Sequence, residues 1–219
     1  MTPHAMRGKF ITFEGPEGGG KTTQARQLIA RLTAAGRPAR YAREPGGTRT
    51  GEAIRAVLQH DQAGETPTPE AELLLFAASR AQLVRQVILP ALDSGAWVVC
   101  DRFADSTTAY QGYGRGFPLP AVRAINDFAI GAATPDLTIL LDLPVADGFA
   151  RLAERQARDG AGPDRMEREA RAFHERVRAG YLELAAQSPE RFFVVDARAS
   201  ADAVAEHIWK RVQHECRAG

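Results

Sequence analysis

Eight residues near the N-terminus combine glycines, a lysine and a threonine at the spacing that binds nucleotide phosphates. Residues 15–22 read Gly-Pro-Glu-Gly-Gly-Gly-Lys-Thr, which matches the pattern GxxxxGK[ST]. Glycines let backbone N–H groups close around phosphate oxygens, and a helix that follows adds a favourable dipole. Lys21 would reach the β- and γ-phosphates, and the Thr22 hydroxyl would bind Mg²⁺. The chain has three lysines, at 9, 21 and 210, so a lysine at this motif position is informative. The predicted residues for the phosphates of a nucleoside triphosphate are Gly15, Pro16, Glu17, Gly18, Gly19, Gly20, Lys21, Thr22 and Thr23.

A carboxylate that positions the metal is also expected, and two predicted strands end in aspartate. Asp101 follows Val-Val-Cys, and Asp142 follows Leu-Leu. In P-loop proteins a carboxylate at such a position holds Mg²⁺, which we expect here through a water molecule. We favour Asp101 because the next residue, Arg102, could hold the transferring phosphates. Asp142 remains the alternative.

The motif requires a strand before it and a helix after it, and the hydrophobic pattern predicts both. Apolar runs predict five strands, at residues 9–14, 39–43, 96–100, 137–143 and 192–195. Helical spacing predicts helices at 21–35, 49–59, 70–93, 120–132, 145–157, 166–187 and 200–215. Loop-rich inserts are expected near 103–118 and 155–165. This alternation predicts an α/β fold of the P-loop NTPase type, with a five-stranded, mostly parallel sheet and helices on both faces.

Composition and charge limit the class of protein. The 219 residues are 44% hydrophobic and 25% charged, which fits one globular domain. We assign residues 1–8 to a short extension and 9–215 to a single domain. The net charge of +1 argues against nucleic-acid binding by bulk electrostatics. Two widely separated cysteines fit a reducing compartment, and no signal peptide or membrane span is apparent. We expect a cytoplasmic protein with no membrane or nucleic-acid partner.

Seven segments, taken together, resemble a known family. They are 13–18 (FEGPEG), 43–47 (REPGG), 76–80 (FAASR), 101–103 (DRF), 106–112 (STTAYQG), 135–138 (PDLT) and 164–167 (DRME). In this order they resemble the bacterial thymidylate kinases, from about residue 9 to the final helix. The resemblance implies a fold like that of nucleoside monophosphate kinases and transfer of the γ-phosphate of ATP to dTMP with Mg²⁺. It also implies a homodimer.

The resemblance assigns roles in binding dTMP to eight residues. Phe76 would stack on thymine, as an aromatic face can, while Arg80 and Gln111 would read the edge of the base. Tyr110 would crowd the position of a ribose 2′-hydroxyl. The remaining contacts are Glu17 with the 3′-hydroxyl, Arg43 and Arg102 with the acceptor phosphate, and Ser106 in the pocket lining.

A lid rich in arginine is expected near 155–165. One variant of the family carries an arginine in the P-loop directly after the acidic residue, where this chain has Gly18. The other variant carries arginines in the lid, and residues 151–165 contain four. A guanidinium holds phosphate oxygens through a fixed fork and stays charged. The expected catalytic arginines of the lid are Arg155, Arg158 and Arg165, beside Lys21, Asp101 and Arg102.

Two other functions remain open from the sequence. The first is a kinase for another nucleotide or a deoxynucleoside. The second is a P-loop protein that binds nucleotide without turnover. A GTPase is disfavoured because the NKxD motif is missing, and the chain's one asparagine, Asn126, is followed by Asp-Phe-Ala.

Overall fold

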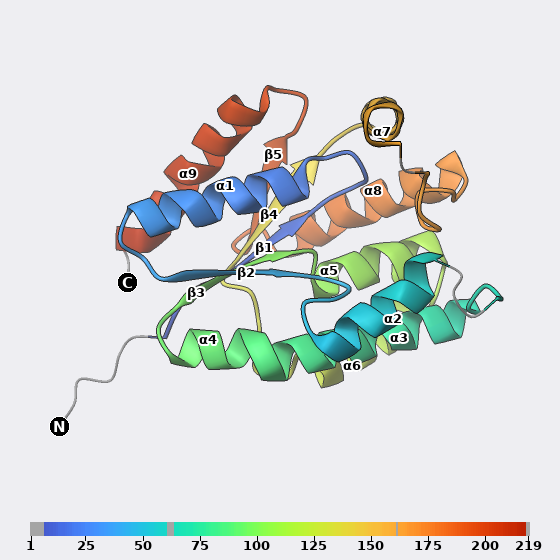
Figure 1. The fold of residues 1–219 in the computed structure, drawn as a ribbon, viewed down its shortest axis with the longest axis horizontal. Coiled ribbons are helices and arrows are strands. Elements are labelled where there is room, and N and C mark those ends of the chain that lie inside the picture. The colour runs from blue at the N-terminus through green and yellow to red at the C-terminus, as the bar shows by residue number, and fades with distance from the viewer. Residues whose placement is uncertain (1–6, 61–63, 161, 218–219) are drawn as a thin grey trace.

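A parallel β-sheet forms the centre of the computed structural model, which describes residues 7–60, 64–160 and 162–217. Its strands run in the order β2-β3-β1-β4-β5, and every neighbouring pair is parallel (Figure 1). They are β1 (Phe10–Glu14), β2 (Ala39–Arg43), β3 (Trp97–Asp101), β4 (Leu137–Asp142) and β5 (Phe192–Asp196). The predicted strands agree with these to within one residue at each end, and the predicted fold class is confirmed.

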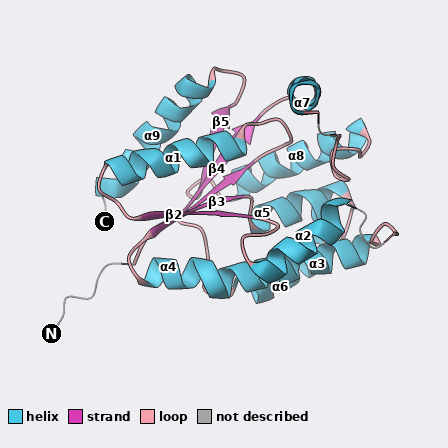
Figure 2. Ribbon diagram, viewed as in Figure 1, coloured by secondary structure: helices cyan, strands magenta, loops and turns pink. Residues whose placement is uncertain are grey.

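Helices connect the strands and cover both faces of the sheet (Figure 2). They are α1 (Lys21–Ala34), α2 (Arg49–His60), α3 (Pro69–Leu83), α4 (Leu89–Asp93), α5 (Ala104–Thr107), α6 (Leu119–Ile130), α7 (Val145–Asp159), α8 (Arg171–Gln187) and α9 (Ala201–Arg217). Two π-helical segments, η1 (Val84–Ile88) and η2 (Thr108–Gly114), continue α3 and α5 respectively.

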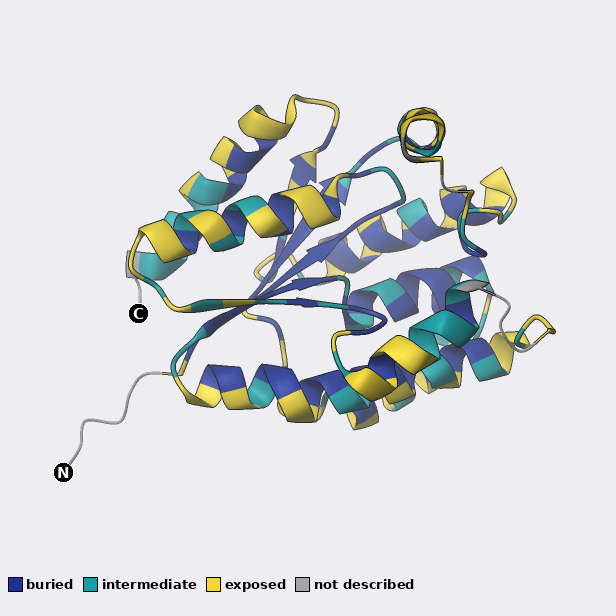
Figure 3. Ribbon diagram, in the orientation of Figure 1, coloured by how far each residue is buried: buried dark blue, intermediate teal, exposed yellow. Residues whose placement is uncertain are grey.

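The alternation of side chains along the strands explains the two-sided core. Ile11 and Phe13 of β1 pack with α1 and α9 on one face. Phe10 of β1 and Val98 of β3 pack on the other face, against the continuous run from Leu83 to Leu92. The central strands are therefore buried on both sides, as their dark colour in Figure 3 shows. This is why they read as unbroken apolar runs in the sequence.

The strand order brings two predicted site segments together. β1 ends at Glu14, and the P-loop follows it directly. β3 is the hydrogen-bonded neighbour of β1, with Phe13 in register with Asp101. Because the strands are parallel, the P-loop and the end of β3 meet at the carboxyl edge of the sheet, where open α/β sheets bind ligands.

Three boundaries differ from the prediction. The insert 103–118 is mostly helical, as α5 and η2, because Ala109 and Tyr110 are buried against α8 and this packing overrides weak propensity. Helix α7 continues through Asp159, so the start of the predicted lid is helical. Helix α8 begins at Arg171 rather than 166, because residues 164–167 form a turn closed by side chains.

The helical run Pro69–Asp93 is the one stretch within the described residues that is long and apolar enough to cross a membrane. In the structure its second half packs on the sheet through Leu83, Val84 and Ile88, each 0% exposed. Its apolar character is thus used in the protein core.

Candidate active site

The P-loop folds around the amino group of its own lysine. Lys21 Nζ donates to the carbonyl oxygens of Gly15 and Pro16, at 3.0 and 2.7 Å. Burial and the nearby charge of Arg102 lower the pKa of Lys21 to about 8, against the attraction of Glu17. The lysine is thus held at the loop before any phosphate is bound.

A glycine pair lets the P-loop lie directly on α7. Gly18 has a positive φ of 74°, and a Cβ built there would lie 2.5 Å from Gly148 O. A Cβ on Gly148 would in turn lie 2.5 Å from Glu17 O. Only residues without a Cβ fit at both positions. The position of the alternative P-loop arginine is therefore occupied by a backbone contact.

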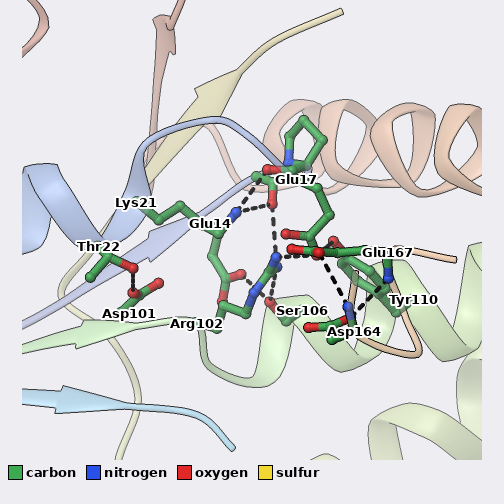
Figure 4. Close-up of polar contacts among 12 residues, drawn as sticks. Glu14, Glu17, Lys21, Thr22, Asp101, Arg102, Ser106, Tyr110, Asp164 and Glu167 are labelled. Atoms are coloured by element: carbon green, nitrogen blue, oxygen red, sulfur yellow. Dashed lines mark hydrogen bonds and ion pairs between the residues drawn. The ribbon is translucent and has the colours of Figure 1, made fainter. Parts of the chain in front are cut away.

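The two aspartates considered for the metal have different surroundings in the structure. Thr22 Oγ1 donates to Asp101 Oδ2 at 2.5 Å, so the hydroxyl and carboxylate predicted to serve Mg²⁺ are adjacent (Figure 4). Asp142 instead accepts two bonds from Arg178, at 2.7 and 2.9 Å. Of the two, Asp101 lines the cavity described below and Asp142 does not.

Arg102, Glu17 and Tyr110 form a charged cluster beside the P-loop (Figure 4). Glu17 Oε1 accepts from Arg102 Nη2 at 2.6 Å and from the Tyr110 hydroxyl at 2.8 Å. Burial alone would raise the pKa of Glu17, but Arg102, Lys21 and the Tyr110 hydrogen bond together lower it to about 2. Glu17 is therefore a carboxylate at neutral pH and accepts hydrogen bonds.

Glu14 lies beneath this cluster and was not predicted as a site residue. Its Oε1 accepts from Phe103 N at 2.7 Å, and its Oε2 accepts from Ser106 Oγ at 2.6 Å and from the Tyr181 hydroxyl at 3.0 Å. Burial and the nearby Asp105 raise the pKa of Glu14 to about 7. Arg102, which has a positive φ of 68°, directly precedes Phe103. Glu14 thus fixes the turn that aims Arg102. A buried acid at the end of an apolar strand was the available signal.

A cavity of about 740 Å³ unites these groups with the predicted base site. Its lining includes Glu17, Gly18, Gly20, Lys21, Thr22, Thr23, Arg43, Phe76, Arg80, Asp101, Arg102, Ser106, Tyr110, Gln111, Arg151 and Arg155. Phosphate-binding and aromatic groups from distant parts of the chain therefore share one space. Arg55 and Asp164 also line it, and neither was predicted. Among the predicted P-loop residues, Gly15, Pro16 and Gly19 are outside this lining.

Arg80 is buried among protein acceptors. It is 1% exposed and pairs with Glu44 at 2.6 Å. It also donates to Asn126 Oδ1 at 2.8 Å and to Thr107 Oγ1 at 2.9 Å. A site that fixes a guanidinium this firmly can present it to a ligand without further ordering. Arg43, at the cavity edge, is bound by both carboxylate oxygens of Glu52, each at 2.9 Å.

The predicted lid arginines occupy three different environments. Arg155 lines the cavity and pairs with Glu167 at 2.6 Å. Arg158 is exposed and does not line the cavity. Arg165 is also outside the lining; it is 7% exposed and pairs with Glu72 at 2.5 Å. Arg151, absent from the predicted catalytic set, lines the cavity and donates to Ala197 O at 2.9 Å.

The parallel sheet, the P-loop at the end of β1 and the large cavity beside it define a P-loop phosphotransferase with a second binding space for an acceptor. The thymidylate kinase family model matches residues 13–208, and the chain belongs to this family. It is therefore an enzyme of the nucleoside monophosphate kinase class.

Known relatives agree over nearly the whole chain. A thymidylate kinase of Citrifermentans bemidjiense is 51% identical over 217 residues, covering 97% of this chain and 96% of the relative. A thymidylate kinase of Deinococcus radiodurans is 51% identical over 206 residues, covering 94% and 97%. The crystal structure of thymidylate kinase from Ehrlichia chaffeensis superposes with a TM-score of 0.75 at 33% identity, covering 94% of this chain and 99% of that one.

Proposed function

We propose that the cavity binds ATP at the P-loop and dTMP at the aromatic end, and that its residues carry the reaction of the family. That reaction is the phosphorylation of dTMP to dTDP, with ATP as the donor, and it is the function of this chain. The observation that carries the residue assignment is the shared cavity lined by Lys21, Arg102, Phe76 and Tyr110.

The chemistry requires positioning rather than a strong base. An oxygen of the dTMP phosphate attacks the γ-phosphorus, the bond from that phosphorus to the bridging oxygen breaks, and ADP leaves. Four cations of the cavity lining would surround the migrating phosphoryl group with positive charge: Lys21, Arg102, Arg151 and Arg155. Because the acceptor phosphate is already an anion, no residue has to remove a proton from it.

Glu17 suits a role in holding the sugar of dTMP. Its low pKa of about 2 keeps it ionised, so it can accept a hydrogen bond from a 3′-hydroxyl. Tyr110 packs beside it and would limit the space at the 2′ position. Phe76 and Gln111 line the cavity and would contact the base.

The oxygen ligands at Thr22 and Asp101 fit Mg²⁺, which prefers hard oxygen donors and keeps several waters. We propose that Thr22 would bind the ion directly and that Asp101 would hold it through a water. When bound there, the ion would neutralise charge on the β- and γ-phosphates.

A homodimer is the second part of the proposal. α3 and α6 pack against each other, and each exposes a large apolar side chain: Leu74 is 56% and Phe128 is 84% exposed. We propose that a second copy of this chain covers this pair, since such side chains often mark an interface. Size-exclusion chromatography with light scattering would test this: Phe128→Ser should shift a dimer toward monomer. The two free thiols, Cys100 and Cys216, support the proposed cytoplasmic location.

ADP release in the presence of ATP and Mg²⁺ tests the function against dTMP, dUMP, UMP, dCMP, AMP and GMP. We expect fast turnover with dTMP, slow turnover with dUMP and negligible turnover with the others. Lys21→Ala serves as the inactive control. Turnover led by another monophosphate would keep the kinase class and overturn the base site. ATP binding without turnover of any of these acceptors would indicate a binding protein.

A further inference from the structure

A buried carboxylate lies behind the wall of the cavity at Gln111. Glu72 on α3 and Gln111 on η2 are each 1% exposed. Gln111 Nε2 donates to Glu72 Oε1 at 2.8 Å. Gln111 lines the cavity, whereas Glu72 does not. The amide is therefore held between a carboxylate on one side and the substrate space on the other.

Two arginines fix the Glu72 carboxylate and keep it charged. Arg115 donates through Nε to Oε1 at 3.2 Å and through Nη2 to Oε2 at 3.1 Å. Arg165 Nη2 pairs with Oε2 at 2.5 Å. Burial alone would raise the pKa of Glu72, but the hydrogen bonds from Arg115 and Gln111 and the charge of Arg165 lower it. At neutral pH Glu72 therefore offers acceptors only.

This charge decides which way the Gln111 amide points. A glutamine side chain has a donating NH₂ group on one side and an accepting carbonyl on the other. Facing an ionised carboxylate, it must turn the NH₂ group toward that carboxylate. The carbonyl oxygen, Oε1, is then the atom left to face a ligand in the cavity.

We propose that Glu72 is a positioning residue that sets base specificity by holding the Gln111 carbonyl toward the substrate. Thymine and uracil carry an N3–H donor, which an amide carbonyl accepts. Cytosine carries an unprotonated N3, an acceptor that the same carbonyl repels. The inference rests on the proposed function, in which Gln111 contacts the base.

The substitution Glu72→Gln should reverse this polarity. Oε2 of Glu72 faces both guanidinium groups, whereas Oε1 has a single longer bond from Arg115 Nε at 3.2 Å. The carbonyl oxygen of the new amide would therefore take the Oε2 position, and the longer bond would be lost. Its NH₂ group would then face Gln111, whose amide turns to accept the bond and presents its own NH₂ to the base. We expect the ratio of kcat/KM for dTMP to that for dCMP to fall by at least about tenfold.

The ratio separates specificity from general damage to the protein. A residue that only supports the fold would lower kcat/KM for both substrates and leave the ratio unchanged. Glu169→Gln is the matched control, because Glu169 pairs with the same Arg115 at 2.6 Å, whereas the Gln111 amide donates to Glu72. In a Gln111→Ala background, Glu72→Gln should cause no further fall in the ratio, since the amide that it acts through is gone.

The variant leaves the buried Arg165 and the partly buried Arg115 with less compensating charge, so folding is checked by thermal unfolding. If Glu72→Gln does not fold, the pair Glu72→Gln/Arg165→Gln removes one of those charges and is expected to show the same fall in the ratio. A folded variant with an unchanged ratio overturns the inference while the proposed function stands. A wild-type protein that does not prefer dTMP overturns the proposed function and the base reading with it.

Discussion

Tyr110 has two contacts that single substitutions can separate. Its hydroxyl donates to Glu17 at 2.8 Å. Its ring packs edge-on against Phe173 and Tyr181, with centroids 6.0 and 6.3 Å away, and the Arg102 guanidinium lies 5.1 Å from its centroid. Tyr110→Phe removes the hydroxyl alone, while Tyr110→Ala removes both. The proposed role in excluding a 2′-hydroxyl belongs to the ring.

The structure sets the size of each effect. A hydrogen bond to a charged group contributes about 1.5 to 3 kcal/mol, and Glu17 keeps its bond from Arg102, so we take the lower end. Tyr110→Phe should therefore lower kcat/KM for dTMP by about tenfold and leave discrimination against the ribonucleotide unchanged. Tyr110→Ala empties a site that is 6% exposed. It should reduce the free energy of unfolding by about 3 kcal/mol and reduce discrimination by about 10- to 100-fold.

The assay is ADP release with dTMP and with its ribose counterpart, paired with urea unfolding of each variant. Tyr113→Phe is the control, because Tyr113 lies on the same η2 segment but outside the cavity lining. Equal loss of discrimination in the Phe and Ala variants would assign sugar selection to the hydroxyl. Unchanged discrimination in both would refute the role of Tyr110.

Three further outcomes follow from the P-loop and its neighbours. The pKa of Lys21, about 8, lies below the usual value for a lysine, so the free enzyme loses this positive charge as pH rises through about 8. We therefore expect kcat/KM for ATP to fall in that pH range. Lys21→Arg should move the fall to higher pH. Asp101→Asn should lower turnover at least about 100-fold. Asp142→Asn should leave turnover within about twofold, because the Asp142 carboxylate is outside the cavity lining. Similar losses of turnover in both variants would contradict the assignment of Asp101 to the metal. Gly18→Arg should lower the free energy of unfolding by about 1 to 3 kcal/mol, because its Cβ would clash with Gly148 O. Denaturant titration measures this loss, and the variant should not raise turnover.

The parts of the site that the sequence predicted are those carried by local pattern. The P-loop has fixed spacing, and the strands beside it read as apolar runs, so Lys21 could be assigned to the phosphates and Asp101 to the metal from the sequence alone. The choice of Asp101 over Asp142 used the neighbouring Arg102, and the Thr22–Asp101 bond supports it.

Contacts between residues that are distant in the sequence could not be predicted from local sequence patterns. Nothing in the residues around Glu14 shows that a tyrosine 167 positions later completes its hydrogen bonds. The helical character of 104–114 depends on packing against α8 rather than on its glycine- and threonine-rich sequence. The same limit explains Arg165: its charge favours a lid role, but its partner, Glu72, is distant in sequence and buried.

Three of the cations that line the cavity share one feature that bears on how the lid acts. Arg102 is held by Glu17, Arg155 by Glu167, and Lys21 by two backbone carbonyls, so each already has acceptors in position. When phosphate oxygens enter the cavity, they would replace these acceptors as the hydrogen-bond partners of the three cations. For Lys21 and Arg102, which are largely buried, most side-chain entropy is already lost on folding, so these two residues can stabilise the migrating phosphoryl group with little reorganisation when substrate binds. A lid arginine is then defined less by its place in the sequence than by having a carboxylate at the cavity wall that phosphate can replace, a condition that Arg155 meets.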